Sequence, residues 1–439
     1  KYPKYKPSGV EWIGEIPEEW EVKKTKYCFK YTTGFTPPTG QNEYYNGEHI
    51  WVTISDMDQK YIFDSSTKLS DVAIEKFKPD VTPKGSLLFS FKLSVGKVAF
   101  AGRDVYTNEA IISIMPNENI NLKYFFYILP DQLLRNANEN IYGAKLLNQE
   151  LIKNASIICP SPEEQTAIAK YLDDKTAKID SLIEKKKKLI ELYKEERTAV
   201  INHYVLGQHL IDNGQTSIDN GQLTMDNSQL SINNYKLPKG WQVKKLKYVA
   251  KVNSESLTEK EDKNLLIHYI DISSVDSDGK IISTTEYLYS DAPSRARRKI
   301  NVGDTILSTV RTYLKAIAYI GEVNNNLICS TGFAVIRPLD VFILKYLFYI
   351  FRSQIIIEKI MSASKGVSYP AIDSEDIKYI SVWYPDKNEQ HQIVQHIEAE
   401  TKRIDSKIAR TEKEIELLQE YRTALISEVV TGKIKVIDN

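Results

Sequence analysis

A long internal repeat constrains this chain more than any other feature of its sequence. The stretch from Ser161 to Gly207 recurs without a gap as Asp386 to Gly432, at an offset of 225 positions. The matching pairs include Gln165 and Gln390, Ile179-Asp180 and Ile404-Asp405, and Arg197-Thr198-Ala199 and Arg422-Thr423-Ala424. Because the period is half of the protein, the pattern indicates one large duplication and not a solenoid of short repeats.

Each copy is predicted to form one long helix. The first begins with Ser161-Pro162-Glu163-Glu164, which offers an N-cap serine, a proline at the first helical position and a glutamate at the third. Asp386 and Glu389 supply the equivalent start in the second copy. Neither copy contains another proline, and each stops at a glycine suited to a left-handed cap. At 1.5 Å per residue, such a helix extends about 65 Å.

A seam of apolar and small residues runs along each predicted helix, at the 3.5-residue spacing of a coiled coil. In the first copy its members are Leu172, Thr176, Ile179, Ile183, Lys186, Ile190, Tyr193, Arg197, Val200 and Tyr204. In the second copy they are Ile397, Thr401, Ile404, Ile408, Thr411, Ile415, Leu418, Arg422, Leu425 and Val429. A helix packed on its own globular domain is the alternative. A rod of about 65 Å outreaches an ordinary domain, so each copy is the expected partner of the other.

The composition is that of an ordinary globular protein. With 439 residues, 42% hydrophobic and 26% charged, the chain has room for about three domains. Its three cysteines, Cys28, Cys159 and Cys329, show neither zinc spacing nor a disulfide framework, which fits a reducing compartment. No apolar run approaches the ~20 residues of a membrane span, and no signal peptide opens the chain. We therefore expect a cytoplasmic protein without a membrane partner.

The residues before the first long helix, 1–160, are predicted to form an α+β domain. Short runs of strand type are broken by Gly, Pro, Asn and Asp, and a helical pattern follows them. The expected strands are 50–54, 86–91, 97–101 and 110–115, and the expected helix is 121–135.

Residues 237–384 repeat this plan loosely. Pro17 and Trp20 align with Pro238 and Trp241, and residues 122–128 align with 344–350. The divergence falls on loops, since 34–46 and 276–298 have no clear twin. Two domains of one framework with unlike loops suggest one task performed on two different targets.

A low-complexity linker, residues 208–236, joins the first long helix to the second domain. Its heptapeptide unit at 211–217 recurs at 218–224 and 225–231, and in decayed form at 232–238. Asn-Gly pairs form helix poorly, so we expect a turn-rich connection. We hypothesise that the linker adjusts the spacing of the two domains, because in-frame repeats invite changes in copy number. A short tail, 433–439, follows the second long helix (385–432).

The order of domain, long helix (161–207), domain and long helix resembles the specificity (S) subunit of Type I restriction-modification enzymes. Glu-Ile-Pro-Glu-Glu-Trp-Glu-Val-Lys-Lys at 15–24 and Leu-Pro-Lys-Gly-Trp-Gln-Val-Lys-Lys at 237–245 resemble the starts of its domains. Pro-Ser-Pro-Glu-Glu-Gln at 160–165 and Pro-Asp-Lys-Asn-Glu-Gln at 385–390 resemble the starts of its conserved regions, as do the Lys/Arg-Ile-Asp segments at 178–180 and 403–405. The resemblance covers nearly the whole chain, and the motifs are specific in combination.

The resemblance implies an α+β fold with two similar globular target-recognition domains, separated by two long helices that pack as an antiparallel, pseudo-twofold coiled coil. Each domain would read one half of a split, asymmetric site on double-stranded DNA, and the helices would act as a ruler. Two methylase subunits would dock on the helices to make an adenine methyltransferase, and two restriction/translocase subunits would complete the restriction enzyme. S-adenosylmethionine, ATP and magnesium would be bound by these partners.

Base reading needs polar side chains on loops that a rigid sheet holds in place. In the first domain the candidates are Ser90, Lys92, Ser94 and Lys97 in one loop, and Tyr142, Lys145 and Asn148 in another. In the second domain they are Ser308, Arg311, Thr312, Tyr313 and Lys315, then Lys365, Ser368 and Tyr369, and finally Arg295, Arg297 and Arg298 for phosphate or guanine. A solvated loop or a structural hydrogen bond is the alternative for each. Phosphate contacts would set register, and base contacts would specify.

The sequence offers no motif for catalysis. Glu21-Val22-Lys23 mimics the Glu-x-Lys of nucleases, but Gln242 replaces Glu21 in the second copy, so a domain-opening strand is the better interpretation. No Asn/Asp-Pro-Pro-aromatic methylase motif, P-loop or Gly-x-Gly loop after a strand occurs. We therefore expect a subunit that is not an enzyme and holds no metal or cofactor of its own.

A coiled-coil adaptor whose globular ends bind proteins is the alternative function. It would explain the rods and the formal net charge of zero, which argues weakly against a nucleic-acid partner. It does not explain why two copies of one fold keep their framework and vary their loops.

Overall fold

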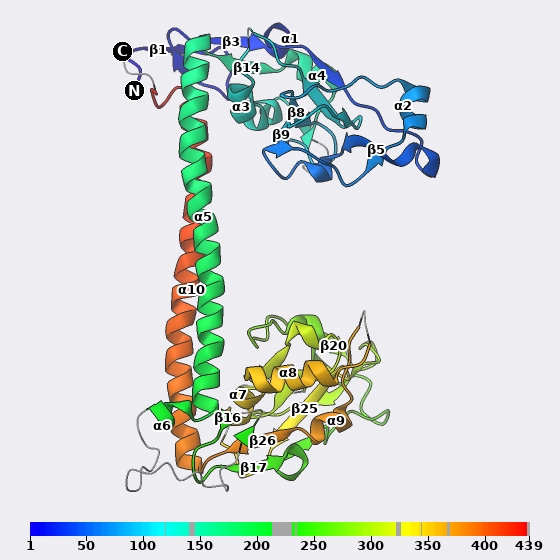
Figure 1. The fold of residues 1–439 in the computed structure, drawn as a ribbon, viewed down its shortest axis with the longest axis vertical. Coiled ribbons are helices and arrows are strands. Elements are labelled where there is room, and N and C mark those ends of the chain that lie inside the picture. The colour runs from blue at the N-terminus through cyan, green and yellow to red at the C-terminus, as the bar shows by residue number, and fades with distance from the viewer. Residues whose placement is uncertain are drawn as a thin grey trace. The chain divides into compact units, whose positions relative to one another are not determined.

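The chain folds into two compact units in a computed structural model that describes residues 1–118, 120–139, 145–212, 231–232, 235–321, 326–343, 345–366 and 369–436. Unit 1 comprises Lys1–Lys185 and Glu414–Asn439, and unit 2 comprises Lys186–Lys413. Each unit therefore contains one globular domain, the beginning of one long helix and the end of the other (Figure 1).

The globular domain of unit 1 is built on a five-stranded sheet of order β4-β11-β8-β9-β6. Its strands are β4 (Tyr31–Thr33), β6 (Tyr61–Ile62), β8 (Leu87–Ser90), β9 (Val98–Ala101) and β11 (Ile111–Ile114). A smaller sheet of order β10-β5-β7 combines β5 (Tyr45–Val52), β7 (Lys68–Leu69) and β10 (Tyr106–Thr107). Three two-stranded ribbons pair β1 (Tyr5–Pro7) with β2 (Glu15–Pro17), β3 (Glu21–Lys24) with β14 (Ser156–Cys159), and β12 (Asn138–Glu139) with β13 (Lys145–Leu146). The helices are α1 (Thr25–Cys28), α2 (Asp71–Phe77), α3 (Leu122–Arg135) and α4 (Gln149–Asn154), with 3-10 turns η1 (Asn42–Tyr44) and η2 (Ile54–Asp56).

The globular domain of unit 2 repeats the central strand order as β18-β25-β22-β23. These strands are β18 (Ala250–Val252), β22 (Thr305–Ser308), β23 (Ile317–Tyr319) and β25 (Phe333–Pro338). A second sheet of order β20-β19-β24-β21 contains β19 (Leu266–Ile270), β20 (Thr285–Leu288), β21 (Ala296–Lys299) and β24 (Leu327–Ser330). The ribbons pair β15 (Ser231–Ile232) with β16 (Tyr235–Lys236), and β17 (Gln242–Lys245) with β26 (Ser381–Tyr384). The helices are α6 (Gln208–Asp212), α7 (Tyr346–Arg352), α8 (Gln354–Ala363) and α9 (Ser374–Lys378), with 3-10 turns η3 (Leu246–Tyr248), η4 (Ile272–Ser274) and η5 (Thr312–Leu314).

The elements expected for the first domain are therefore confirmed, with small shifts at their ends. The strand expected at 50–54 is the end of β5, and the helix expected at 121–135 is α3, which Asn121 caps by accepting from the backbone N–H of Lys123 and Tyr124. Glu21-Val22-Lys23 lies in β3, which pairs with β14 as a domain-opening strand.

Alternation along β8 explains why its sheet is buried on both faces. Leu87 and Phe89 pack with α3 in one core cluster, while Leu88 packs with β5 and β11 in another. Successive strand residues point to opposite faces, so a fully apolar strand holds two layers together.

The two long helices are α5 (Pro162–Val205) and α10 (Lys387–Val430). The hydroxyl oxygen of Ser161 accepts from the Glu164 backbone N–H, and the Asp386 carboxylate accepts from the Asn388 and Glu389 N–H groups, as predicted for the two N-caps. Both helices end at the expected glycines in the left-handed region, with φ of 67° at Gly207 and 75° at Gly432.

The carboxylates predicted to complete the two helix starts hold the globular domains instead. Glu164 accepts from the indole N–H of Trp20 at 2.9 Å and from the Tyr2 hydroxyl at 3.0 Å. In unit 2, Glu389 accepts from the indole N–H of Trp241 at 3.0 Å. Burial raises the pKa of the Glu389 carboxyl, although the bond from Trp241 favours its charged form. The repeated carboxylate thus joins each helix start to the buried tryptophan of its own domain.

In unit 2 the helices run antiparallel. Along α5 the residues Tyr193, Arg197 and Tyr204 contact Lys407, Asp405 and His396 of α10, so the numbering rises on one helix as it falls on the other. In unit 1, Asp180 of α5 pairs with Arg422 of α10. All of the predicted seam positions are buried or half-buried. The coiled-coil interpretation is confirmed, and the alternative of a helix folded only onto its own domain is wrong.

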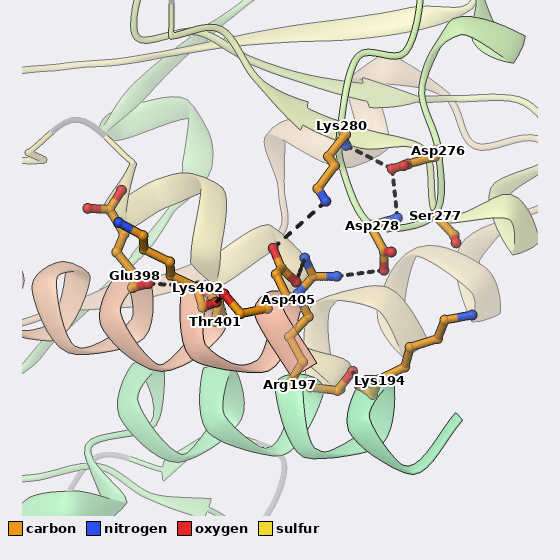
Figure 2. A network of polar contacts seen from close by, with 12 residues as sticks. Lys194, Arg197, Asp276, Ser277, Asp278, Lys280, Glu398, Thr401, Lys402 and Asp405 are labelled. Carbon is orange, nitrogen blue, oxygen red and sulfur yellow. Dashed lines mark hydrogen bonds and ion pairs between the residues drawn. The ribbon is translucent and has the colours of Figure 1, made fainter. Parts of the chain in front are cut away.

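Arg197 joins three segments of unit 2 (Figure 2). Its guanidinium Nη2 lies 2.8 Å from Asp405 Oδ1, and Nη1 lies 2.7 Å from Asp278 Oδ1 in the loop before β20. The Asp276 carboxylate accepts from the backbone N–H groups of Asp278 and Lys280 and so shapes this loop. Because Arg197 is only 7% exposed, the ion pairs are shielded and connect both helices to the domain.

Arg422, the repeat counterpart of Arg197, lies in a different environment. Its ion pair with Asp180 joins α10 to α5 within unit 1, but the Arg422 side chain is 34% exposed and the Asp180 side chain 52%. The duplication therefore supplies two equivalent ion pairs that differ in burial, which is a natural matched control.

The linker begins and ends at the same place. A Cβ placed on Gly207 would lie 2.3 Å from Cγ of Pro238, so the end of the first long helix touches the start of the second domain. The indole N–H of Trp383 also donates to the Val205 carbonyl at 2.6 Å, which holds the helix end on this domain. This contact argues against a role of the linker in domain spacing, and the hypothesis that the linker adjusts that spacing stays a prediction. Residues 213–230 and 233–234 lie outside the described residues.

We predict that Arg197→Ala and Arg422→Ala have unequal effects on local stability. Arg197→Ala should cost on the order of 2 kcal/mol, because the Asp278 carboxylate loses its ion-pair partner and the Asp405 carboxylate keeps only Lys280, at 3.8 Å. Arg422→Ala should cost less than about 1 kcal/mol, because its pair is exposed. Native-state hydrogen exchange of α10 amides near each site measures both values. Equal losses of local stability in the two variants would contradict the conclusion that burial makes the Arg197 ion pairs stronger than the Arg422 ion pair.

Candidate nucleic-acid interface

Equivalent loops leave the central sheet of each domain. One is the β8–β9 loop (residues 91–97) in unit 1, and the other is the β22–β23 loop (residues 309–316) in unit 2. A buried serine fixes each loop at its start. The Ser90 hydroxyl donates to the Ser94 carbonyl at 2.6 Å and accepts from the Lys97 N–H, and the Ser308 hydroxyl donates to the Val310 carbonyl at 2.7 Å.

The tip of the β8–β9 loop is exposed while its base is committed to the domain. Lys92 and Ser94 are exposed, and the Lys92 ammonium lies 5.5 Å from the Phe91 ring centroid. Lys97 is half-buried and pairs with Asp58 at 2.6 Å. Lys92 and Ser94 are therefore available to a partner, whereas Lys97 holds the base of the loop.

The second candidate loop of unit 1 is the β12–β13 hairpin. Lys145 is exposed and forms an ion pair with Glu139 on the facing strand. Asn148 caps α4 by accepting from the Leu151 N–H at 2.8 Å. Tyr142 lies outside the described residues.

In unit 2 the structure brings the two candidate loops together. Ala371 forms β-bridges with both Val310 and Lys365. The Thr312 and Ser364 hydroxyls are 2.9 Å apart, which adds a hydrogen bond between the loops. Lys365 is exposed at this junction, and Ser368 lies outside the described residues.

The junction presents cations beside aromatic rings. The Arg311 guanidinium lies 4.9 Å from the Tyr369 ring centroid, within the range of a cation–π contact. Tyr369 is 66% exposed and Tyr313 is 49% exposed, and Lys315 is also exposed. Such a mixture of positive charge and rings suits a nucleic-acid surface.

Comparison with known proteins agrees with this geometry. The family model for the Type I restriction modification DNA specificity domain matches the chain twice, over residues 17–192 and 238–417. Each match covers one globular domain and the first part of the long helix that follows it.

The chain belongs to the Type I restriction-modification specificity family. Similar proteins include the Type I restriction enzyme MjaIX specificity subunit of Methanocaldococcus jannaschii, which is 25% identical over 437 residues, covering 97% of this chain and 95% of the relative. The EcoDI specificity subunit of Escherichia coli is 22% identical over 391 residues, covering 88% and 82%. A chain from a solved structure on assembly and conformational transition of the type I R-M system has a TM-score of 0.62 at 16% identity, covering 95% of this chain and 99% of that chain, and so shows the same fold. The task of a specificity subunit is DNA sequence recognition.

Several residues that the sequence predicts to contact DNA form contacts within the fold of this specificity subunit. Ser90, Ser308 and Thr312 are buried and hydrogen-bonded within or between loops. Arg297 lies over the Tyr289 ring at 5.0 Å, and Arg298 donates to the Ser256 hydroxyl at 3.4 Å. Both arginines are half-buried in β21, while the neighbouring Arg295 is exposed. A structural role, the alternative left open by the sequence, fits several of these residues, and DNA contact by each of the predicted residues stays a prediction.

One exposed loop residue is absent from the predicted set. Leu93, at the tip of the β8–β9 loop, is 92% exposed and has a φ of 58°. A leucine gives no hydrogen-bonding signal, so a search for polar base readers passes over it. Aligning Ser90 with Ser308 would have placed Leu93 opposite Arg311.

Metal clusters and membrane-spanning helices are the other features to consider among the described residues. Among them, no group of three or more His, Cys, Asp or Glu side chains is arranged to hold a metal ion. None of the helices described combines the length and apolar character that crossing a bilayer needs.

Proposed function

We propose that this chain is the non-catalytic recognition subunit of a heteromeric Type I complex, and that each globular domain reads one half of a bipartite DNA site. The observation that carries the proposal is the contrast between a shared framework and unlike loops. The central strand orders match, whereas the loop tips carry Lys92, Leu93 and Ser94 in one domain and Arg311, Tyr313 and Lys315 in the other. Domains that contact different bases should specify an asymmetric site.

The long helices would set the separation of the two half-sites. Each rod is 44 residues long, or about 66 Å at 1.5 Å per residue. Half-sites about one helical turn apart, ~34 Å, face the same side of the duplex. An antiparallel pair of related helices would present two related domains in inverted orientation, as two half-sites on one duplex require.

The helices would also hold two methylase subunits. Support comes from large apolar side chains that stand outside the seam on α5 and α10. Leu182 is 43% exposed, Leu192 50%, Leu417 50% and Tyr421 56%. Exposed apolar groups along a rod favour a protein partner. The methylase subunits would bind S-adenosylmethionine, and two restriction/translocase subunits would supply the ATP- and magnesium-dependent activity.

A band shift separates this function from the adaptor alternative. The chain assembled with its methylase subunits should retard a random-sequence duplex, with an affinity that falls as salt rises, because phosphate contacts release counterions. An adaptor would not retard DNA at low salt. Methylase subunits without this chain provide the control.

A domain duplication tests the two-part site. Replacing residues 238–384 with residues 17–159 keeps the aligned starts at Pro238 and Pro17 and both helix N-caps. We expect the assembled methyltransferase to modify a site with two identical, inverted halves in place of two unlike ones. Sequencing of methylated positions in the treated DNA gives the motif. A site that keeps the second wild-type half would contradict domain-by-domain reading.

Deleting one heptapeptide unit, residues 218–224, should leave both half-sites and their spacing unchanged. The reason is the contact between Gly207 and Pro238, which bypasses the linker. The same methylation mapping measures the spacer in base pairs. A shift of about three base pairs, the length of a seven-residue helical insert, would instead support a spacing role for the linker.

A further inference from the structure

We propose that Leu93 and Arg311 occupy one equivalent base-reading position, and that their side chains determine a base pair in each half of the DNA site. The inference rests on the proposed function and deepens it, because it names the reading side chains and their chemistry. It arises from four observations on the two loops: equivalent position, left-handed backbone, exposure and rigid support.

The positions are equivalent by structure. β8 and β22 occupy the same place in the two central sheets, each between the counterparts β11 or β25 and β9 or β23. Each strand ends in a buried serine whose hydroxyl ties the loop. Three residues beyond that serine stand Leu93 and Arg311, both at the exposed tip.

Both residues have a backbone conformation that side chains disfavour. The φ angles are 58° at Leu93 and 50° at Arg311, in the region where glycine is the usual residue. Strain of this kind persists where a side chain has a task that glycine could not perform. The same unfavourable conformation at the same point of two diverged domains favours a shared role over chance.

At Leu93 the exposure of an apolar side chain to water is a second unfavourable feature, beside the backbone conformation. A single exposed leucine is ordinary on a protein surface. Here, however, 92% exposure is combined with a left-handed backbone, so neither packing nor backbone preference explains the residue. Apolar side chains read the C5-methyl group of thymine in the major groove. The half-site of the first domain should therefore include an A·T pair read by Leu93.

Arg311 is held ready for a different base. Its guanidinium lies over the Tyr369 ring, and the bridges from Ala371 with the Thr312–Ser364 hydrogen bond join the two loops beneath it. Within the part of the chain that the structure describes, Arg311 forms no ion pair that would occupy its donors. A planar guanidinium donates two parallel hydrogen bonds to O6 and N7 of guanine. The half-site of the second domain should therefore include a G·C pair.

Glycine substitutions test this without disturbing the fold. Leu93→Gly and Arg311→Gly remove the side chain while relieving the backbone, and Arg311→Lys keeps the charge but loses the planar pair of donors. Each full-length variant is assembled with methylase subunits and given a randomised duplex library. Both the retained and the methylated duplexes are sequenced, so that a variant that binds without methylating still reports its base preference.

We expect each variant to relax one base pair in one half-site only. Discrimination at the position read by Arg311 should fall by about tenfold or more in Arg311→Gly, because a lost bidentate contact costs about that much. In Leu93→Gly the preference for an A·T pair should be lost with the apolar contact to the thymine methyl group. Arg311→Lys should relax the same position as Arg311→Gly. Lys78→Gly, at a left-handed residue outside both loops, should leave the motif unchanged and controls for the backbone effect. Lys315→Gly, with a φ of 53°, should weaken binding to all sequences alike if it contacts phosphate.

Three results would overturn the inference. They are an unchanged motif in the Leu93 and Arg311 variants, a uniform loss of binding like that of Lys315→Gly, and full base discrimination by Arg311→Lys. If the wild-type complex itself selected no two-part site, the proposed function would fail instead, and the two failures are thus distinguishable.

Discussion

The structure depends on the burial of both ends of each long helix in globular cores. The first turns of α5 contribute Ile168 and Leu172 to the core of unit 1, and its last turns contribute Ile201 and Val205 to the core of unit 2. In the opposite sense, α10 contributes Ile393 and Ile397 to unit 2, and Leu425 and Val429 to unit 1. An isolated surface-exposed helix of this length would gain little from its seam alone. Anchoring its ends in hydrophobic cores makes helix and domain parts of one cooperative structure.

The anchoring is also specific. A carboxylate at the third position of each helix accepts from a buried indole, and a left-handed glycine closes each helix against a proline and tryptophan of a domain. Trp20 and Pro17 receive the end of α10, and Trp241 and Pro238 receive the end of α5. These contacts explain why Pro and Trp are among the few residues that both domain starts share. The β8–β9 and β22–β23 loops do not make these contacts and have diverged.

Divergence has also changed the balance of equivalent interactions. Arg197 and Arg422 occupy the same position of the repeat. The loop that carries Asp278 adds a second ion pair to Arg197, whereas the ion pair between Arg422 and Asp180 is more exposed. Leu93 and Arg311 likewise share a backbone conformation and differ in chemistry. A duplicated framework can therefore conserve geometry while each copy acquires its own electrostatics and contacts.

The sequence by itself determined the duplication, the limits of the long helices, their seam and the α+β plan. The reason is that apolar periodicity and helix-capping residues are local patterns, and both copies of the repeat contain them. It could not determine which polar loop residues face outward. Ser90, Ser308 and Asn148 are as polar as Ser94, but their side chains are committed to hydrogen bonds with nearby backbone groups, and these bonds depend on the conformation that each loop or helix start adopts in the fold. Tertiary structure alone decided that the ends of the linker touch, that Arg311 lies over Tyr369, and that Leu93 stands exposed. The physical reason is that these features depend on contacts between segments far apart in sequence, which no local pattern encodes.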